Sequence, residues 1–213
     1  MAEVNIEELE KKIFAVFDEF KTINKTKEEG NKFLSIERYA FELNNGKKIY
    51  REKIKKGKGD GSAAIVLPVT KENKVVLAIE PRVFTEGSVD IGFPAGYVEP
   101  GELPPLAAER ELKEETGYEP ERIVFLGSYY PDQGCSEAVN YYYIAFGCEK
   151  VSEQELDAGE FIKYIEVSIG ELDYLLRKGY IKGLNTAYTI EKSKVLLKEL
   201  KNNGNKEGNQ WFN

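Results

Sequence analysis

The sequence predicts an α+β fold in which a mixed β-sheet sandwich is flanked by helices. Three observations predict it. Apolar or alternating runs typical of strands fill much of the first half of the chain, one helical segment interrupts them after residue 100, and further strands and helices follow. A doubly wound parallel fold would instead alternate strands and helices regularly.

An N-terminal extension precedes the main domain. Apolar residues at three- and four-residue steps predict an amphipathic helix over residues 5–22. Residues 33–43 and 47–54 alternate in part and flank Asn44-Asn45-Gly46, a sequence typical of a hairpin turn. We therefore divide the chain into a helix and β-hairpin extension, a main domain and a polar tail: residues 1–60, 61–203 and 204–213.

The main domain begins with short apolar runs that are typical of buried strands. A helix with prolines at its start and a glycine at its end follows. The expected strands are residues 63–69, 75–79, 122–130, 139–147 and 161–167, and the expected helices are residues 103–115, 169–178 and 186–201. Residues 83–92 show little periodicity and read as an irregular crossing segment.

Composition excludes several functional classes. The chain has 213 residues, of which 41% are hydrophobic and 31% charged, as expected of a globular domain with a sizeable core. No run approaches the roughly 18 apolar residues of a membrane span, and the acidic first residues lack an apolar signal core, so we expect a cytoplasmic protein. The net charge of -7 disfavours a broad nucleic-acid-binding surface.

The chain contains no histidine, which removes the usual zinc ligand, the usual general base and the Ser-His and Cys-His nucleophile schemes. Its two cysteines, Cys135 and Cys148, fit neither a zinc knuckle nor a redox pair. Metal or acid–base chemistry must therefore use other side chains, and carboxylates suit Mg²⁺ and Mn²⁺.

One helix gathers carboxylates on one edge. Glu114 and Glu115 follow Glu111 at the i+3 and i+4 positions, and their mutual repulsion costs a few tenths of a kcal/mol per pair unless a cation relieves it. A solvated charged face is the commoner interpretation of a Glu-rich helix. The glycines and prolines at both ends favour a built site, and we expect Arg110 to pair with Glu102 and fix the loop against the helix.

Residues 96–118 resemble the Nudix box, which reads Gly, five residues, Glu, seven residues, Arg-Glu-aliphatic-any-Glu-Glu-any-Gly-aliphatic. Eight positions match without a gap, namely Gly96, Glu102, Arg110, Glu111, Leu112, Glu114, Glu115 and Gly117. Tyr118 stands at the final aliphatic position. The resemblance extends over roughly residues 33–200. It implies a Nudix-type sandwich and hydrolysis, with Mg²⁺ or Mn²⁺, of a nucleoside diphosphate linked to another moiety.

The resemblance also implies roles for individual residues. Glu111, Glu114 and Glu115 would be metal ligands, and Ala95 would add its backbone carbonyl. Because histidine is absent, a carboxylate must take the proton of the attacking water, or the metal must supply hydroxide directly. The second catalytic carboxylate would lie in a loop after the sheet, with Glu160 as first candidate and Glu155 and Asp157 behind it.

Within the family, the chain resembles ADP-ribose and nucleotide-sugar pyrophosphatases. The hairpin, Phe93-Pro94-Ala95-Gly96 and Glu160-Phe161-Ile162 carry this resemblance. Residues 130–134 read Tyr-Pro-Asp-Gln-Gly, whereas these enzymes often have Tyr-Pro followed by Ser-Pro-Gly. Candidate substrate-binding residues are Arg51, Arg82, Pro131 and Glu137. Tyr39, Phe41 and Tyr129 could stack on a base, although such aromatics more often belong to a core.

Two alternatives stay open. The protein could hydrolyse nucleoside triphosphates or dinucleotides, or it could be a non-catalytic module that binds a nucleotide. The resemblance further implies a homodimer, because the N-terminal strands of these enzymes often pair or swap between subunits. Residues 33–54 are the only segment that motivates this expectation.

Overall fold

A computed structural model of the chain describes residues 5–202 except 22, 23, 25, 27–32 and 58. The predicted polar tail, residues 204–213, lies outside the described residues. The elements are α1 (Ile6–Phe20), β1 (Leu34–Glu42), β2 (Lys48–Lys56), β3 (Ala63–Thr70), β4 (Lys74–Pro81), β5 (Val89–Gly92), β6 (Ala95–Tyr97), α2 (Pro104–Thr116), β7 (Tyr118–Glu119), β8 (Arg122–Tyr129), β9 (Asn140–Lys150), β10 (Lys163–Ser168), α3 (Ile169–Arg177) and α4 (Leu184–Asn202).

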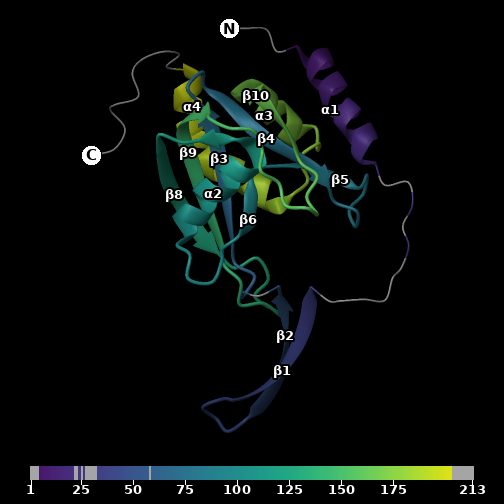
Figure 1. The fold of residues 1–213 in the computed structure, drawn as a ribbon. Coiled ribbons are helices and arrows are strands. Elements are labelled where there is room, and N and C mark those ends of the chain that lie inside the picture. The colour runs from purple at the N-terminus through teal and green to yellow at the C-terminus, as the bar shows by residue number, and fades with distance from the viewer. Residues whose placement is uncertain (1–4, 22–23, 25, 27–32, 58, 203–213) are drawn as a thin grey trace.

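The main sheet is mixed. Its order is β10-β4-β3-β9-β7, and β5, β6 and β8 are added to β4, β3 and β9 respectively. Strands β3 and β9 run parallel, whereas the other pairs in this sheet are antiparallel. The predicted mixed α+β sandwich is therefore confirmed (Figure 1).

Helices cover both faces of the sheet, which explains why β3 is apolar without alternation. Ile65 and Leu67 face a core that includes buried residues of α1, α3 and α4. Ala64 and Val66 face the other side, where they pack with Leu112 and other residues of α2. Each successive side chain of β3 thus enters a different apolar layer.

The N-terminal hairpin stands apart from this body (Figure 1). Strands β1 and β2 form a separate two-stranded antiparallel sheet whose side chains are mostly exposed. Contacts at its base include the Ile54 N–H, which donates to the Cys135 carbonyl over 2.8 Å, and an ion pair of 2.8 Å between Lys53 and Glu137. The predicted hairpin is confirmed, but a large part of its apolar surface has no partner within the described chain.

The sequence prediction is wrong for one segment and incomplete for two others. Residues 83–92 are not irregular throughout, because Val89–Gly92 form β5 on the edge of β4. Two further strands, β6 and β7, have three and two residues. Strands this short carry too few residues to show a period, so sheet pairing alone reveals them.

The helices follow their sequence signals closely. Asn5 caps α1 by accepting a hydrogen bond from the Glu8 backbone N–H, and Ser168 and Glu171 form a capping box at α3. Within the part of the chain that the structure describes, no helix combines the length and apolar character needed to cross a bilayer.

Candidate active site

Helix α2 is fixed at its end by a glycine. Gly117 adopts a left-handed conformation at φ 74° and donates its N–H to the Lys113 carbonyl. A Cβ at this position would lie 2.0 Å from the Ser152 carbonyl oxygen. Only glycine therefore ends the helix here while the acidic loop after β9 passes this close.

The loop before α2 is a tight turn that two hydrogen bonds close. The Glu102 N–H donates to the Glu99 carbonyl over 2.9 Å, with Pro100 and Gly101 between them and Gly101 at φ 86°. The Glu102 carboxylate accepts in return from the Glu99 N–H over 3.0 Å. Proline followed by a left-handed glycine suits a type II turn. The turn brings the Glu102 side chain toward α2.

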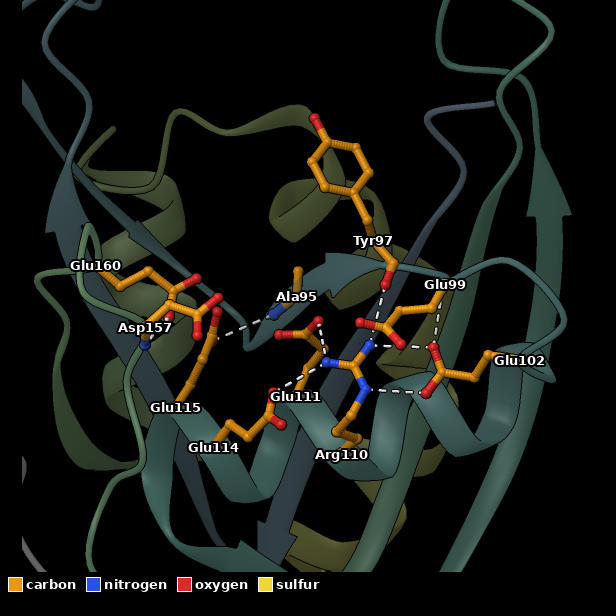
Figure 2. Close-up of polar contacts among 10 residues, drawn as sticks. All are labelled: Ala95, Tyr97, Glu99, Glu102, Arg110, Glu111, Glu114, Glu115, Asp157 and Glu160. Atoms are coloured by element: carbon orange, nitrogen blue, oxygen red, sulfur yellow. Dashed lines mark hydrogen bonds and ion pairs between the residues drawn. The ribbon is translucent and has the colours of Figure 1, made fainter. Parts of the chain in front are cut away.

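Arg110 joins this loop to the acidic edge of the helix (Figure 2). Its guanidinium makes two hydrogen bonds to Glu102, of 2.9 and 3.1 Å, which confirms the predicted ion pair. It also donates to Glu111 over 2.7 Å, to Glu114 over 2.9 Å and to the Tyr97 carbonyl over 3.0 Å. These bonds occupy all five guanidinium donors, a pattern that lysine cannot reproduce.

Gly96 leaves room for the Glu111 carboxylate. A Cβ on Gly96 would stand 2.0 Å from the carboxyl carbon of Glu111 and 2.0 and 2.3 Å from its two oxygens. The Glu111 carboxylate therefore lies directly against the backbone of β6. This close approach is the physical reason for glycine at the first position of the box.

Burial raises the pKa of two of these carboxyl groups. Burial raises the pKa of Glu111 to about 7, with the charges of Glu114 and Glu160 adding to the rise and Arg110 opposing it. Burial also raises the pKa of Glu115 well above its ordinary value, helped by the charge of Glu111. The Ala95 N–H donates to Glu115 over 3.3 Å, which opposes this rise. Both groups would gain from a cation that replaces the lost hydration.

The acidic loop of residues 151–162 is tied to the end of α2. The Gln154 amide donates to the Glu115 carbonyl over 2.5 Å and to the Ile162 carbonyl over 3.1 Å. The Glu155 N–H donates to the Glu114 carbonyl over 2.8 Å. These bonds satisfy carbonyls that a helix end leaves open and hold the loop over the acidic edge.

Glu160 lies on the Glu115 side of the cluster (Figure 2). Its carboxylate accepts from the Asp157 N–H over 3.1 Å, which closes a turn in the acidic loop. Its charge raises the pKa of both Glu111 and Glu115. The structure thus brings Glu160 and Asp157 to the cluster, whereas Glu155 is placed by its backbone bond to the helix end.

The carboxylates of Glu111, Glu114 and Glu115 are suitable ligands for a hard divalent cation, but their oxygens do not converge on one point. Among the described residues, no three acidic or cysteine side chains converge as metal ligands do. The reason is visible in the contacts: Arg110 binds Glu111 and Glu114, and Glu115 turns to the Ala95 N–H. The chemistry of such a site is nevertheless present. It includes carboxylate oxygens, raised carboxyl pKa values and the space beside Gly96 that the Glu111 carboxylate occupies, called here the Gly96 cradle.

The predicted substrate residues divide into two groups. Arg82, one residue after β4, pairs with Glu80 over 2.5 Å. Because the charge of Glu80 raises the pKa of Glu115, this pair lies close to the acidic cluster. Arg51 lies on the projecting hairpin and donates to the Tyr50 carbonyl, so the single chain does not bring it to the cluster.

Pro131 and Glu137 lie in the loop between β8 and β9, and Glu137 pairs with Lys53 at the base of the hairpin. The structure gives Glu137 a tethering contact there. Tyr39 and Phe41 are exposed on the hairpin, not in the core. Tyr129 packs with Tyr142 and Tyr188 at ring-centroid distances of 6.0 and 5.0 Å.

Sequence reasoning missed Glu80. This residue is partly buried, its pKa is raised by burial, and its charge in turn raises the pKa of Glu115. Glu80 lies near the end of β4 and Arg82 one residue beyond it, so a strand continued through both would place their side chains on one face. Without the sheet register, that face could not be assigned to the acidic cluster.

Comparisons with known proteins agree with this geometry. The family model of the NUDIX domain matches residues 60–185. The chain is 32% identical to an ADP-ribose pyrophosphatase of Bacillus subtilis (strain 168), covering 81% of this chain and 91% of that protein. It is 37% identical to a methanol dehydrogenase activator of Bacillus methanolicus, covering 64% of this chain and 72% of that protein.

A solved structure described as an ADP compounds hydrolase shares the fold, with a TM-score of 0.67 and 22% identity over 85% of this chain and 94% of that chain. Proteins of this family generally use divalent metals. The family model matches more than half of the chain, and the alignment with the Bacillus subtilis relative covers 91% of that protein. The chain therefore belongs to the Nudix hydrolase family.

Proposed function

We propose that the protein is a pyrophosphohydrolase that cleaves ADP-ribose or a related ADP-sugar into AMP and a sugar phosphate, using Mg²⁺ or Mn²⁺. The observation that carries the proposal is the acidic edge of α2, where Glu111 lies in the Gly96 cradle. The names of two relatives support the substrate class, an ADP-ribose pyrophosphatase and an ADP-sugar pyrophosphatase of Mus musculus that is 37% identical over 97 residues.

Glu111, Glu114, Glu115 and the Ala95 carbonyl would hold the cation. A cation held there would neutralise charge on the diphosphate and lower the pKa of the attacking water. Glu160 would accept the proton of that water as the water oxygen bonds to phosphorus and the anhydride P–O bond breaks. Arg110 has no donor left for substrate, so we assign it the role of positioning Glu111 and the Glu102 loop.

The test compares substrate classes side by side. Purified protein with Mg²⁺ or Mn²⁺ is incubated with ADP-ribose, ADP-glucose, diadenosine polyphosphates and ATP, and AMP is quantified by chromatography. The Glu115→Gln variant is the control, because it keeps the shape of the side chain and removes its charge. AMP from ADP-ribose above this control supports the proposal, and its absence refutes it.

Two other results would replace the proposal. A higher kcat/KM on ATP or on dinucleotides would make the protein a hydrolase of those compounds. Tight binding of ADP-ribose without turnover in the presence of metal would make it a non-catalytic nucleotide-binding module. The retained acidic edge favours catalysis over this last outcome.

We also propose a homodimer formed through the hairpin. Ile36 is 70% exposed and Tyr50 55% exposed, and this much apolar surface on a two-stranded sheet is typical of an interface. A monomeric mass by light scattering at assay concentration would exclude it. A cytoplasmic location is part of the same proposal, supported by two free thiols, Cys135 and Cys148, that suit a reducing compartment.

A further inference from the structure

A pocket of about 510 Å³ lies outside the acidic cluster, between the β4–β5 loop and the segment that joins α3 to α4. This volume falls within the range of about 300–1,000 Å³ of small-molecule sites. Glu86 on the β4–β5 loop and Lys182 on the opposite segment form an ion pair of 2.7 Å, which links the two walls. Phe17 of α1 and Tyr180 add an apolar side.

Asp90 supplies a carboxylate to this pocket. The backbone N–H groups of Ile91 and Gly183 donate to it, and a Cβ on Gly183 would lie 2.8 Å from its Oδ2 atom. Burial nevertheless raises the pKa of Asp90, so these two donors do not replace the hydration that the carboxylate has lost. A carboxylate offers about four lone-pair sites, which leaves acceptor capacity for a ligand.

The pocket adjoins the acidic cluster through one cross-strand pair. Asp90 of β5 lies directly opposite Glu80 of β4 in the antiparallel register, so their side chains share a face of the sheet. Arg82 pairs with Glu80 over 2.5 Å, and its charge opposes the rise that burial causes in the pKa of Asp90. The charge of Glu80 in turn raises the pKa of Glu115. Arg82 is thus paired with Glu80, next to the acidic cluster, and its charge also acts on Asp90 in the pocket.

We propose that this pocket receives the sugar of the substrate, with Asp90 accepting hydrogen bonds from the sugar hydroxyls and Arg82 contacting the adjacent phosphate. The inference deepens the proposed function and rests on it.

A hydroxylated ligand matches the pocket better than a nucleobase does. An acceptor-only carboxylate suits hydroxyl donors, and the ammonium groups of Lys178 and Lys182 suit hydroxyl and ring oxygens. The rings of Phe17 and Tyr180 each make a T-shaped pair with Phe14, with interplanar angles of 86° and 69°. Phe14 thus packs against both rings and joins them into one apolar wall of the pocket.

The first experiment needs no turnover. Binding of ribose 5-phosphate and of glucose 1-phosphate to the metal-loaded protein is measured by calorimetry for wild type, Asp90→Asn, Asp90→Glu and Asp173→Asn. We expect Asp90→Asn to weaken binding of at least one sugar phosphate by about 10- to 100-fold, the range for a lost hydrogen bond to a charged group. Asp90→Glu should retain most of the binding.

Asp173→Asn is the matched control, because Asp173 lies on α3 and pairs with Arg177 outside the pocket. It should bind both sugar phosphates as wild type does. Equal binding by Asp90→Asn and wild type would overturn the proposal. Melting temperatures separate misfolding from lost contacts. If Asp90→Asn unfolds, Asp90→Ser takes its place, with the same expected loss of binding and the same overturning result.

The second experiment compares ADP-ribose with the β-methyl ester of ADP, which has the diphosphate but no sugar beyond it. Asp90→Asn should raise KM for ADP-ribose and leave KM for the methyl ester unchanged. Equal effects on both substrates would overturn the sugar site while ADP-ribose hydrolysis stands. If wild type cleaves no ADP-ribose but binds a sugar phosphate through Asp90, the sugar site is retained and the proposed function fails.

Discussion

The cradle at Gly96 gives the sharpest prediction about catalysis. In Gly96→Ala, the new Cβ would stand 2.0 Å from the Glu111 carboxyl carbon, whereas ordinary van der Waals contact begins at 3.4 Å. The carboxylate must therefore move by more than an ångström. It cannot move freely, because it is buried and receives a 2.7 Å hydrogen bond from Arg110.

A displacement of about 1 Å in a catalytic group can lower the rate on the order of 100-fold. We expect Gly96→Ala to lose turnover on this scale and to bind Mg²⁺ about 10- to 100-fold more weakly, as when a ligand loses its positioning contacts. The folded state should survive, since the clash involves the end of one side chain. Its free energy of unfolding should fall by about 1.5–3 kcal/mol if the bond to Arg110 is lost.

Steady-state kinetics, Mg²⁺ calorimetry and thermal melts measure these three quantities. Gly134→Ala is the control, because a Cβ there would meet its nearest atom at an ordinary 3.6 Å. Wild-type turnover and metal affinity in Gly96→Ala would refute the reasoning, since Glu111 would then not need the place in which the structure puts it.

Three further predictions concern the groups around this cradle. Arg110→Lys should lower the melting temperature of the metal-free protein, because an ammonium cannot replace the paired bonds to Glu102 while also reaching Glu111; an unchanged melt would contradict this. Raised carboxyl pKa values, about 7 for Glu111 and higher than usual for Glu115, mean that the folded metal-free protein holds protons that the unfolded chain releases above about pH 4.5. The free energy of unfolding should thus fall as pH rises from 4.5 to 7. Binding of Mg²⁺ should also release protons, which calorimetry in two buffers of different ionisation enthalpy would detect. Zero proton release would contradict the raised pKa values. Gln154→Ala removes the hydrogen bonds to the Glu115 and Ile162 carbonyls, so kcat should fall and amide hydrogen exchange in residues 151–162 should accelerate. Exchange as slow as in wild type would show that Gln154 does not hold this loop.

The longer elements were predictable because their signals are local. The apolar spacing of α1, the punctuation of α2 and the hairpin turn each lie within about 20 residues, and all three elements form within one or two residues of the predicted bounds. The Arg110–Glu102 pair was predictable for the same reason, since eight residues separate the partners across a helix start. Strands β5, β6 and β7 were not, because two to four residues show no period.

The substrate side was harder to predict because its contacts cross the chain. Pro131 and Glu137 were chosen by their place in the sequence, yet Glu137 pairs with Lys53, 84 residues away. Arg51 was chosen in the same way and lies on the projecting hairpin. Glu80 and Asp90 were overlooked, because their proximity depends on the β4–β5 register and not on any local spacing.

By itself, the sequence determined the carboxylate chemistry of this protein. Three glutamates at helical spacing, a chain without histidine and glycines at both ends of the box specify which groups can act. Only the tertiary structure decided how these groups are held. Five hydrogen bonds occupy Arg110, Glu111 lies against Gly96, and Asp90 lies beside Glu80 at the edge of a pocket. Helical spacing is a local property of the backbone, whereas sheet register and loop closure are set by packing among distant segments.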